Sequence, residues 1–224
     1  MHIEPGIVDG AKITLSYATA AAAGATGLFQ AAKSLREKGA LSLVARSSMA
    51  TAGVFVFFEV MPHFSAGVSE VHFILGSTLF LILGAGPAAI GLAMGLLLQG
   101  LFFAPTDLPQ LGMNLTTLLV PLFALHEVAR RMIAPGTAYV DLDYKQVLAL
   151  SAVYQGGVVA WVAFWVVYGA GATAPTLAGI GTFALAYASV LLIEPLVDVA
   201  VLAIAKTLRA NGSALVTTRL YHKV

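Results

Sequence analysis

The stretch from Leu177 to Ala205, LAGIGTFALAYASVLLIEPLVDVAVLAIA, decides the class of fold. A helix needs about 20 mainly apolar residues to cross the hydrocarbon core of a bilayer, and this run is longer. The rest of the chain has the same character, with 59% hydrophobic and 10% charged residues among 224 and a mean hydropathy of +0.89. Soluble domains carry about 25% charged residues, so a chain this apolar belongs in lipid.

Six further hydrophobic runs predict membrane-spanning helices. The third is short for a full span, so its helix either stops inside the bilayer or borrows residues from the preceding loop. A helix-breaking hairpin, Gly84-Ala-Gly86-Pro87, joins it to the fourth. We therefore expect an all-α, multi-pass transmembrane bundle of about seven helices, forming a single domain over residues 1–224. The six runs are Ile13–Ala32, Ser47–Pro62, Val71–Leu83, Pro87–Phe103, Leu111–Met132 and Val147–Tyr168.

Basic residues indicate the orientation of the bundle. Seven spans put the two ends of the chain on opposite sides, and all of the 12 Lys and Arg residues except Lys12 fall on the side of the C-terminus. The positive-inside rule then places the C-terminus in the cytoplasm and the N-terminus outside, as expected of an inner-membrane protein. A net charge of +1 without a basic tract gives no sign of nucleic-acid binding. Because the chain has no Cys, it forms neither disulfides nor thiolate metal sites.

The chain opens with Met1-His2-Ile3-Glu4-Pro5-Gly6, which lacks the basic front and apolar run of a signal peptide. A free α-amine, the His2 amide nitrogen and the His2 imidazole can close two fused rings around one divalent metal ion. Three nitrogens near one plane suit Ni(II) or Cu(II). We expect Met1 to be retained because the bulky His2 hinders its removal. Residues 1–12 are thus a candidate metal-binding segment.

His72 opens the third span and lies, by topology, at the same membrane face as His2. Neutral imidazole is a common metal ligand, so His72 is a candidate for the fourth nitrogen. Glu70 is close enough in sequence to orient a ligand or attract cations. Glu59 and His63 lie at the outer end of the second span, and we interpret them as an interfacial pair in preference to a second metal site.

Other polar residues in the spans also need partners. Gln99 and Asn114 lie towards the outside, where their amides can hold the amino-terminal segment in a pocket. His126 and Glu127 approach the basic pair Arg130–Arg131 and cannot reach the outer site. For Glu194 and Asp198 two readings stay open, bonds to a neighbouring helix or contacts with basic residues of a partner subunit.

Small residues and missing motifs narrow the function further. The glycines at 91 and 95, and the alanines at 18, 21, 22 and 25, favour close helix packing within the subunit over docking to another membrane protein. The chain has no P-loop, HExxH or nucleophile elbow, so it cannot use ATP alone and shows no hydrolase signature. It also lacks the chain of charged residues typical of a proton-driven carrier.

Four sequence pieces stand out in order along the chain: Met1-His2-Ile3-x-x-Gly6, Ser69-x-x-His72-x-x-x-Gly76, Leu98-Gln99-Gly100-Leu101-Phe102-Phe103 and Leu111-Gly112-Met113-Asn114. Together they resemble the CbiM/NikM family, the substrate-capture membrane subunits of energy-coupling-factor ABC transporters for cobalt and nickel. The resemblance covers roughly the first 135 residues well and the rest mainly by hydropathy. This chain departs from the family pattern at Glu4-Pro5, at Pro105-Thr106-Asp107 and at Glu70-Val71.

The resemblance implies a seven-helix subunit whose amino terminus is tucked into an outward-facing pocket. The metal, Ni2+ or Co2+, would be held by the Met1 amine, the His2 amide and imidazole nitrogens, and His72. Gln99 and Asn114 match positions that support these ligands. Transport would need a transmembrane coupling subunit, two cytoplasmic ATPases and, in some systems, a small accessory membrane subunit.

We therefore read the chain as the permease subunit that captures Ni2+ or Co2+ from outside for ATP-driven import, without enzymatic activity of its own. A capture subunit for a vitamin or another organic substrate is the alternative. A membrane enzyme or haem-binding electron carrier is less favoured because the spans contain no convincing His pair. A structural scaffold would leave Met1, His2 and His72 unexplained.

Overall fold

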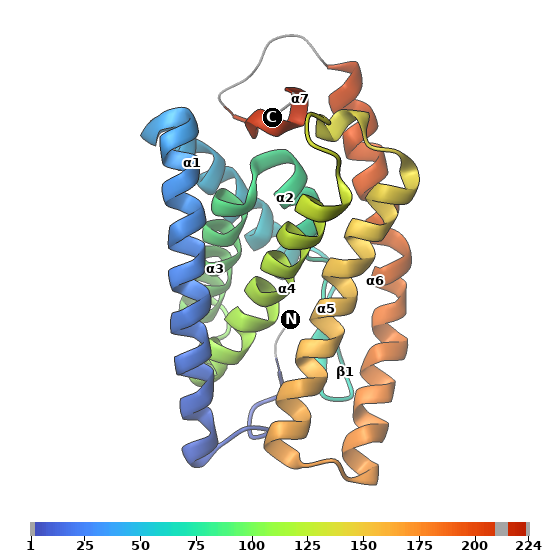
Figure 1. The fold of residues 1–224 in the computed structure, drawn as a ribbon. Coiled ribbons are helices and arrows are strands. Elements are labelled where there is room, and N and C mark those ends of the chain that lie inside the picture. The colour runs from blue at the N-terminus through green and yellow to red at the C-terminus, as the bar shows by residue number, and fades with distance from the viewer. Residues whose placement is uncertain (1–2, 209–214, 223–224) are drawn as a thin grey trace.

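A computed structural model describes residues 3–208 and 215–222. These residues form a bundle of seven α-helices with one short β-hairpin inside it (Figure 1). The hairpin consists of β1 (Phe64–Ala66) and β2 (Ser69–Val71). The helices are α1 (Ile13–Phe55), α2 (Gly76–Leu83), α3 (Ala85–Phe102), α4 (Leu111–Met132), α5 (Tyr144–Ala170), α6 (Ala174–Thr207) and α7 (Thr218–Tyr221).

The first two predicted spans form one interrupted element. Five helical stretches in the described residues are long and apolar enough to cross a membrane, and the longest, Gly10–Val60, has 51 residues. At 1.5 Å per residue such a helix would be roughly 75 Å long, far more than the ~30 Å hydrocarbon core. Gly39 interrupts it with φ 78° and ψ 173°, a conformation open to glycine. The element therefore provides two spans, and the described basic residues from Lys33 to Lys38 lie just before the break.

The third span is only partly helical. Helix α2 has 8 residues, and residues 72–75 before it have no regular secondary structure. Before these residues lies the hairpin, in which Phe64 pairs with Val71 and Ala66 with Ser69. The short third run thus forms a half-helix whose remaining depth is filled by extended chain. Such backbone is tolerated at membrane depth only where protein surrounds it.

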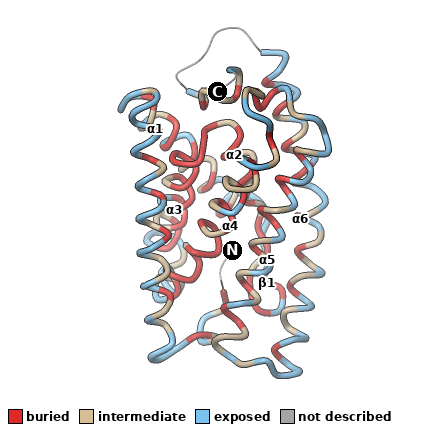
Figure 2. The backbone as a smooth tube through the Cα atoms, viewed as in Figure 1, coloured by how far each residue is buried: buried red, intermediate tan, exposed pale blue. Residues whose placement is uncertain are grey.

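Close packing between α1 and α3 depends on glycine. A Cβ on Gly91 would lie 2.2 Å from the Ala50 Cβ, and one on Gly95 would lie 2.5 Å from Cγ1 of Val54. The packing role predicted for these two glycines is therefore confirmed. The predicted packing of the α1 alanines is wrong, because Ala23 and Gly27 form the buried face of this helix. The alanines at 18, 21, 22 and 25 are exposed. Figure 2 shows that much of α1 is exposed.

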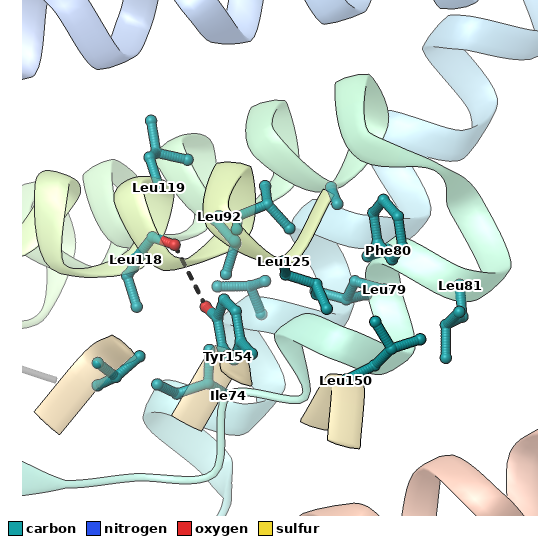
Figure 3. Close-up of a cluster of buried hydrophobic side chains, with 14 of the residues drawn as sticks. Ile74, Leu79, Phe80, Leu81, Leu92, Leu118, Leu119, Leu125, Leu150 and Tyr154 are labelled. Carbon is teal, nitrogen blue, oxygen red and sulfur yellow. Dashed lines mark hydrogen bonds between the residues drawn. The ribbon is translucent and has the colours of Figure 1, made fainter. Parts of the chain in front are cut away.

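The buried core lies where α2 to α5 meet. Figure 3 shows Leu79, Leu92, Leu125 and Tyr154, one from each of these helices, in a single cluster. Large apolar side chains such as Leu28, Leu185 and Leu192 are instead exposed on α1 and α6, as expected of helices that face lipid.

The two ends of the bundle differ in charge. The break in α1, the end of α4, the start of α5, the end of α6 and α7 lie together at one end (Figure 1), and these elements carry the basic stretches. There Lys38 donates to the Val216 carbonyl at 2.8 Å, and Arg219 lies 5.3 Å from the centre of the Tyr139 ring. Burial raises the pKa of the Tyr139 hydroxyl. At the other end Lys12 donates to the Gly169 carbonyl at 2.7 Å. The predicted charge asymmetry is thus an asymmetry between the ends of the folded bundle.

Candidate metal-capture site

The amino-terminal segment enters the bundle and joins the hairpin. Ile3 forms an antiparallel bridge with Ser69, and the Glu4 amide donates to the Val68 carbonyl at 3.2 Å. The Ile3 amide donates to the Asn114 side-chain oxygen at 3.0 Å. The prediction that Asn114 holds this segment is therefore confirmed. Since backbone groups in lipid must be satisfied within the protein, these bonds allow the chain to run through the interior.

Apolar contacts enclose the same segment. Ile3 and Val8 are each 1% exposed and pack with Met113 of α4 and Trp165 of α5. The Trp165 indole is fixed in turn, because it donates to the Thr116 hydroxyl at 3.1 Å. These contacts join the amino-terminal segment to α4 and α5, which are distant from it in the sequence.

Gly169, near the end of α5, brings the backbone of the amino-terminal segment unusually close. A Cβ at this position would lie 2.1 Å from the Ile7 carbonyl oxygen and 2.7 Å from Cγ2 of Val8. Only a residue without a side chain permits this approach. Gly169 therefore helps to set how deeply the segment enters, a role that its sequence context did not reveal.

His72 lies at the base of the hairpin and is fully buried. Its Nε2 atom lies 2.9 Å from Oε2 of Glu70, whose side chain is 27% exposed. Its ring packs 5.3 Å from the Phe58 ring, centre to centre. Phe58 belongs to a π-helical turn, Val56–Val60, which ends the second span. Such turns are rare and are often found at functional sites.

His63 lies directly over His72. The two rings are 5.0 Å apart between centres and nearly parallel, at 16°. The helical turn ends at Val60, so Glu59 and His63 do not lie on one continuous helix. The exposed His63 instead covers one side of the buried His72. No sequence spacing indicated this contact, because a β-hairpin separates the two residues.

The remaining candidate residues lie at both ends of the bundle. Gln99 is 3% exposed near the end of α3, and its Oε1 atom has no hydrogen-bond partner among the described residues. His126 lines a cavity of about 460 Å3 at the end where α7 lies. Glu127 forms ion pairs of 3.1 Å with Arg130 and 2.8 Å with Arg131. The predicted separation of His126 and Glu127 from the outer site is therefore confirmed.

The first two candidate ligands, Met1 and His2, lie outside the described residues. Within 3–208 and 215–222, no three His, Asp or Glu side chains form a group that could hold a metal ion. Glu70 and His72 alone provide too few donors for a specific site. A metal centre at this position would need ligands from outside the described part of the chain.

Comparison with known families decides the identity. Residues 2–211 match the model of CbiM, the cobalt uptake substrate-specific transmembrane region. The chain belongs to the CbiM family. It is thus a substrate-specific transmembrane subunit of a metal uptake system, not an enzyme, and its family's transported substrate is a transition metal, cobalt. A comparison with curated protein sequences finds no match.

Solved structures share the fold of this CbiM-family chain. A crystal structure of a transition metal transporter superposes with a TM-score of 0.68, covering 95% of this chain and 95% of the other. A truncated transition metal transporter gives 0.65, covering 92% of this chain and 97% of the other. Both structures share 20% sequence identity with this chain. At that identity the likeness shows the arrangement of helices and not the residues of the site.

Proposed function

We propose that this CbiM-family subunit captures one Ni2+ or Co2+ ion with its own amino terminus. The ligands are the Met1 α-amine, the His2 amide nitrogen, the His2 imidazole and the His72 imidazole. Four nitrogen donors in one plane match the tetragonal preference of Ni(II). The ion is substrate, held for transfer across the membrane.

One observation carries this proposal, the insertion of Ile3 between Ser69 and Asn114. Ile3 follows directly on the two terminal ligands in the sequence, and Ser69 precedes His72 by three positions. Two extended residues reach at most about 7 Å. The docking of Ile3 therefore supports the proposal that the Met1 amine and His2 bind the same ion as His72. It also lowers the entropy cost of closing the chelate, as Pro5 does by restricting the free chain.

Glu70 supports the same proposal by orienting His72. Metal-bound imidazoles usually donate their second ring N–H to a carboxylate, which fixes the tautomer and strengthens the ligand. The 2.9 Å contact between His72 Nε2 and Glu70 fits that pairing. In this proposal Nε2–H is the donor to Glu70, and Nδ1 is the atom that binds the metal. Glu70 then contacts His72 and does not bind the metal itself. Because its carboxylate is partly exposed, its negative charge can also attract cations from solution.

The donor set also ranks the two metals. Sites of nitrogen donors bind Ni2+ more tightly than Co2+, following the general order of divalent affinities. The purified chain should therefore prefer Ni2+ in direct competition. Which ion is imported also depends on metal availability, and cobalt remains the substrate that the family description names.

For transport, the chain would act with the other components of an energy-coupling-factor transporter. These are a transmembrane coupling subunit, two cytoplasmic ATPases and, in some systems, a small accessory membrane subunit. The positive-inside rule places the α7 end, rich in Lys and Arg, in the cytoplasm. The end where Ile3 enters the bundle then faces outward from the inner membrane, where an incoming ion would arrive.

Metal content of protein purified without a His tag tests the proposal. Mass spectrometry first establishes that the chain starts at Met1. After addition of excess Ni2+ or Co2+ and desalting, we expect close to one metal ion per chain. A chain that retains no metal, yet copurifies with an organic molecule, would support the alternative of a vitamin-capture subunit and contradict this one.

A further inference from the structure

Two buried carboxylates of α6 hold the broken third span together. Glu194 is 0% and Asp198 1% exposed, although both lie deep in an otherwise apolar helix. Oε1 of Glu194 accepts hydrogen bonds from the backbone amides of Ile74 and Leu75, the latter at 3.0 Å. These contacts decide between the two readings of the sequence: among the described residues, the carboxylates bond to segments of the same chain.

The surroundings of Glu194 consist of hydrogen-bond donors. Besides the two backbone amides, Gln155 of α5 donates its side-chain amide to Oε2 of Glu194. The amide oxygen of Gln155 accepts in turn from the Tyr187 hydroxyl. Both carboxylate oxygens are thus acceptors within a protein network. This arrangement suits an anchor for backbone N–H groups, whereas a cation site would present oxygen atoms to an empty space.

The backbone that Glu194 holds would otherwise be costly in lipid. Residues 72–75 have no regular secondary structure, and Leu75, the residue before α2, has φ 53° and ψ 34°. A left-handed conformation is unfavourable for a residue with a side chain, and unpaired N–H groups cost several kcal/mol in an apolar medium. Glu194 satisfies two such N–H groups at once. It therefore stabilises the irregular backbone directly after His72.

Asp198 and Tyr154 fix the start of α2 that follows. Asp198 accepts from the Ser77 hydroxyl at 2.6 Å and from the Thr78 hydroxyl. A Cβ on Gly76 would lie 2.1 Å from Cζ of Tyr154, whose ring therefore packs directly against the first residue of the helix. With α2 fixed in this way, the position of residues 72–75 depends on how Glu194 holds their amide groups.

We propose that Glu194 is a positioning residue for metal capture: by holding the amides of Ile74 and Leu75, it sets where the His72 imidazole lies. This inference rests on the proposed role of His72 as a metal ligand. Glu194 itself does not touch the metal. Its contribution is geometric, and its charge matters only as far as it strengthens the two hydrogen bonds.

Two substitutions separate geometry from charge. Glu194→Gln removes the charge but keeps an oxygen for both amides, because Gln155 can turn its own amide to accept from the new N–H2 group. Glu194→Asp keeps the charge but shortens the side chain by one methylene, so it cannot reach the same amides. We expect Glu194→Gln to bind Ni2+ within threefold of the unaltered chain, and Glu194→Asp to bind at least tenfold more weakly.

A spectroscopic measurement distinguishes positioning from general loss of stability. With Cu2+ as probe, electron paramagnetic resonance reports the number of nitrogen ligands. Glu194→Asp should lose one nitrogen, and Glu194→Gln should keep all. Arg46→Met is the matched control, because Arg46 is 1% exposed and bonds to the Leu83 carbonyl at 2.7 Å, at the far end of α2. It should lower the melting temperature without changing the nitrogen count or the Ni2+ affinity.

The outcomes are distinct. The inference is overturned if Glu194→Asp binds Ni2+ like the unaltered chain, if Glu194→Gln loses affinity as Glu194→Asp does, or if Arg46→Met loses the same nitrogen. His72→Ala separates this failure from failure of the proposed function. If His72→Ala keeps full affinity and all nitrogens, His72 is not a ligand and both proposals fall. If it loses them while Glu194→Asp does not, only the positioning role fails.

Discussion

The backbone amide of Ile3 donates a hydrogen bond of 3.0 Å to the side-chain oxygen of Asn114, across 111 positions of sequence. Both partners are 1% exposed. The bond ties the start of the chain to the first turn of α4. Together with the bridge between Ile3 and Ser69, it turns a chain end into a fixed structural element.

Asn114→Leu should therefore weaken metal capture. It removes the acceptor for the Ile3 amide and leaves this group buried without a partner, at a cost of about 1–3 kcal/mol. We expect Ni2+ affinity to fall about tenfold in equilibrium dialysis. Asn114→Asp, which keeps the acceptor oxygen, is the control and should retain most of the affinity. If Asn114→Leu binds Ni2+ as tightly as the unaltered chain, the bond between Ile3 and Asn114 is unimportant for the site.

Gly169→Ala should loosen the same segment from the side of α5. The added Cβ would lie 2.1 Å from the Ile7 carbonyl oxygen, so the backbone must shift. Overpacking of this kind costs about 1–3 kcal/mol, and we expect a lower melting temperature together with weaker Ni2+ binding. Gly156→Ala is the control on the same helix, because nothing lies within 4 Å of its Cβ. It should leave both quantities nearly unchanged.

Nickel binding should weaken in acid. A free imidazole titrates near pH 6.5 and an α-amine near pH 7.7–8.0, and both must lose their protons to bind metal. As the pH falls below about 8, protons compete first for the amine and then for the imidazoles, so the apparent affinity drops and is weakest below about pH 6. Isothermal titration with Ni2+ from pH 5 to 8 measures this directly. A flat profile would argue against nitrogen ligands.

The membrane-spanning architecture was largely readable from hydropathy. Each run of apolar residues corresponds to a helical segment, and the short run before Leu83 correctly indicated an incomplete helix. The sequence did not reveal what replaces its missing turns. Three-residue strands such as β1 and β2 carry too little periodicity to be recognised, and in an apolar chain their composition does not stand out.

The polar residues were predictable in part. Asn114 was recognised because an amide in lipid needs a partner, and its partner turned out to be the segment expected. The partners of Glu194 were hidden, since they are backbone amides 119 and 120 positions away, and no side-chain pattern marks a backbone N–H. The stacking of His63 on His72 escaped notice for a similar reason: it depends on where an irregular turn ends.

His72→Ala should reduce Ni2+ affinity at least tenfold, because it removes one of four proposed nitrogen ligands. The effect should be larger than that of any substitution at the exposed His63, which covers the site but is not assigned as a ligand. Equilibrium dialysis of the two alanine variants in parallel checks this order. A greater loss of Ni2+ affinity in His63→Ala would contradict this order and indicate that the metal lies nearer to the surface.

The central claim, that the chain's own amino terminus is the chelator, is tested most directly by adding one residue before Met1. The added residue converts the α-amine into an amide but leaves His2, His72 and Asn114 unchanged. Nickel bound per chain is then measured for the native and extended proteins after tag-free purification. The native chain should hold close to one ion and the extended chain almost none. Equal nickel content in the two would contradict the account.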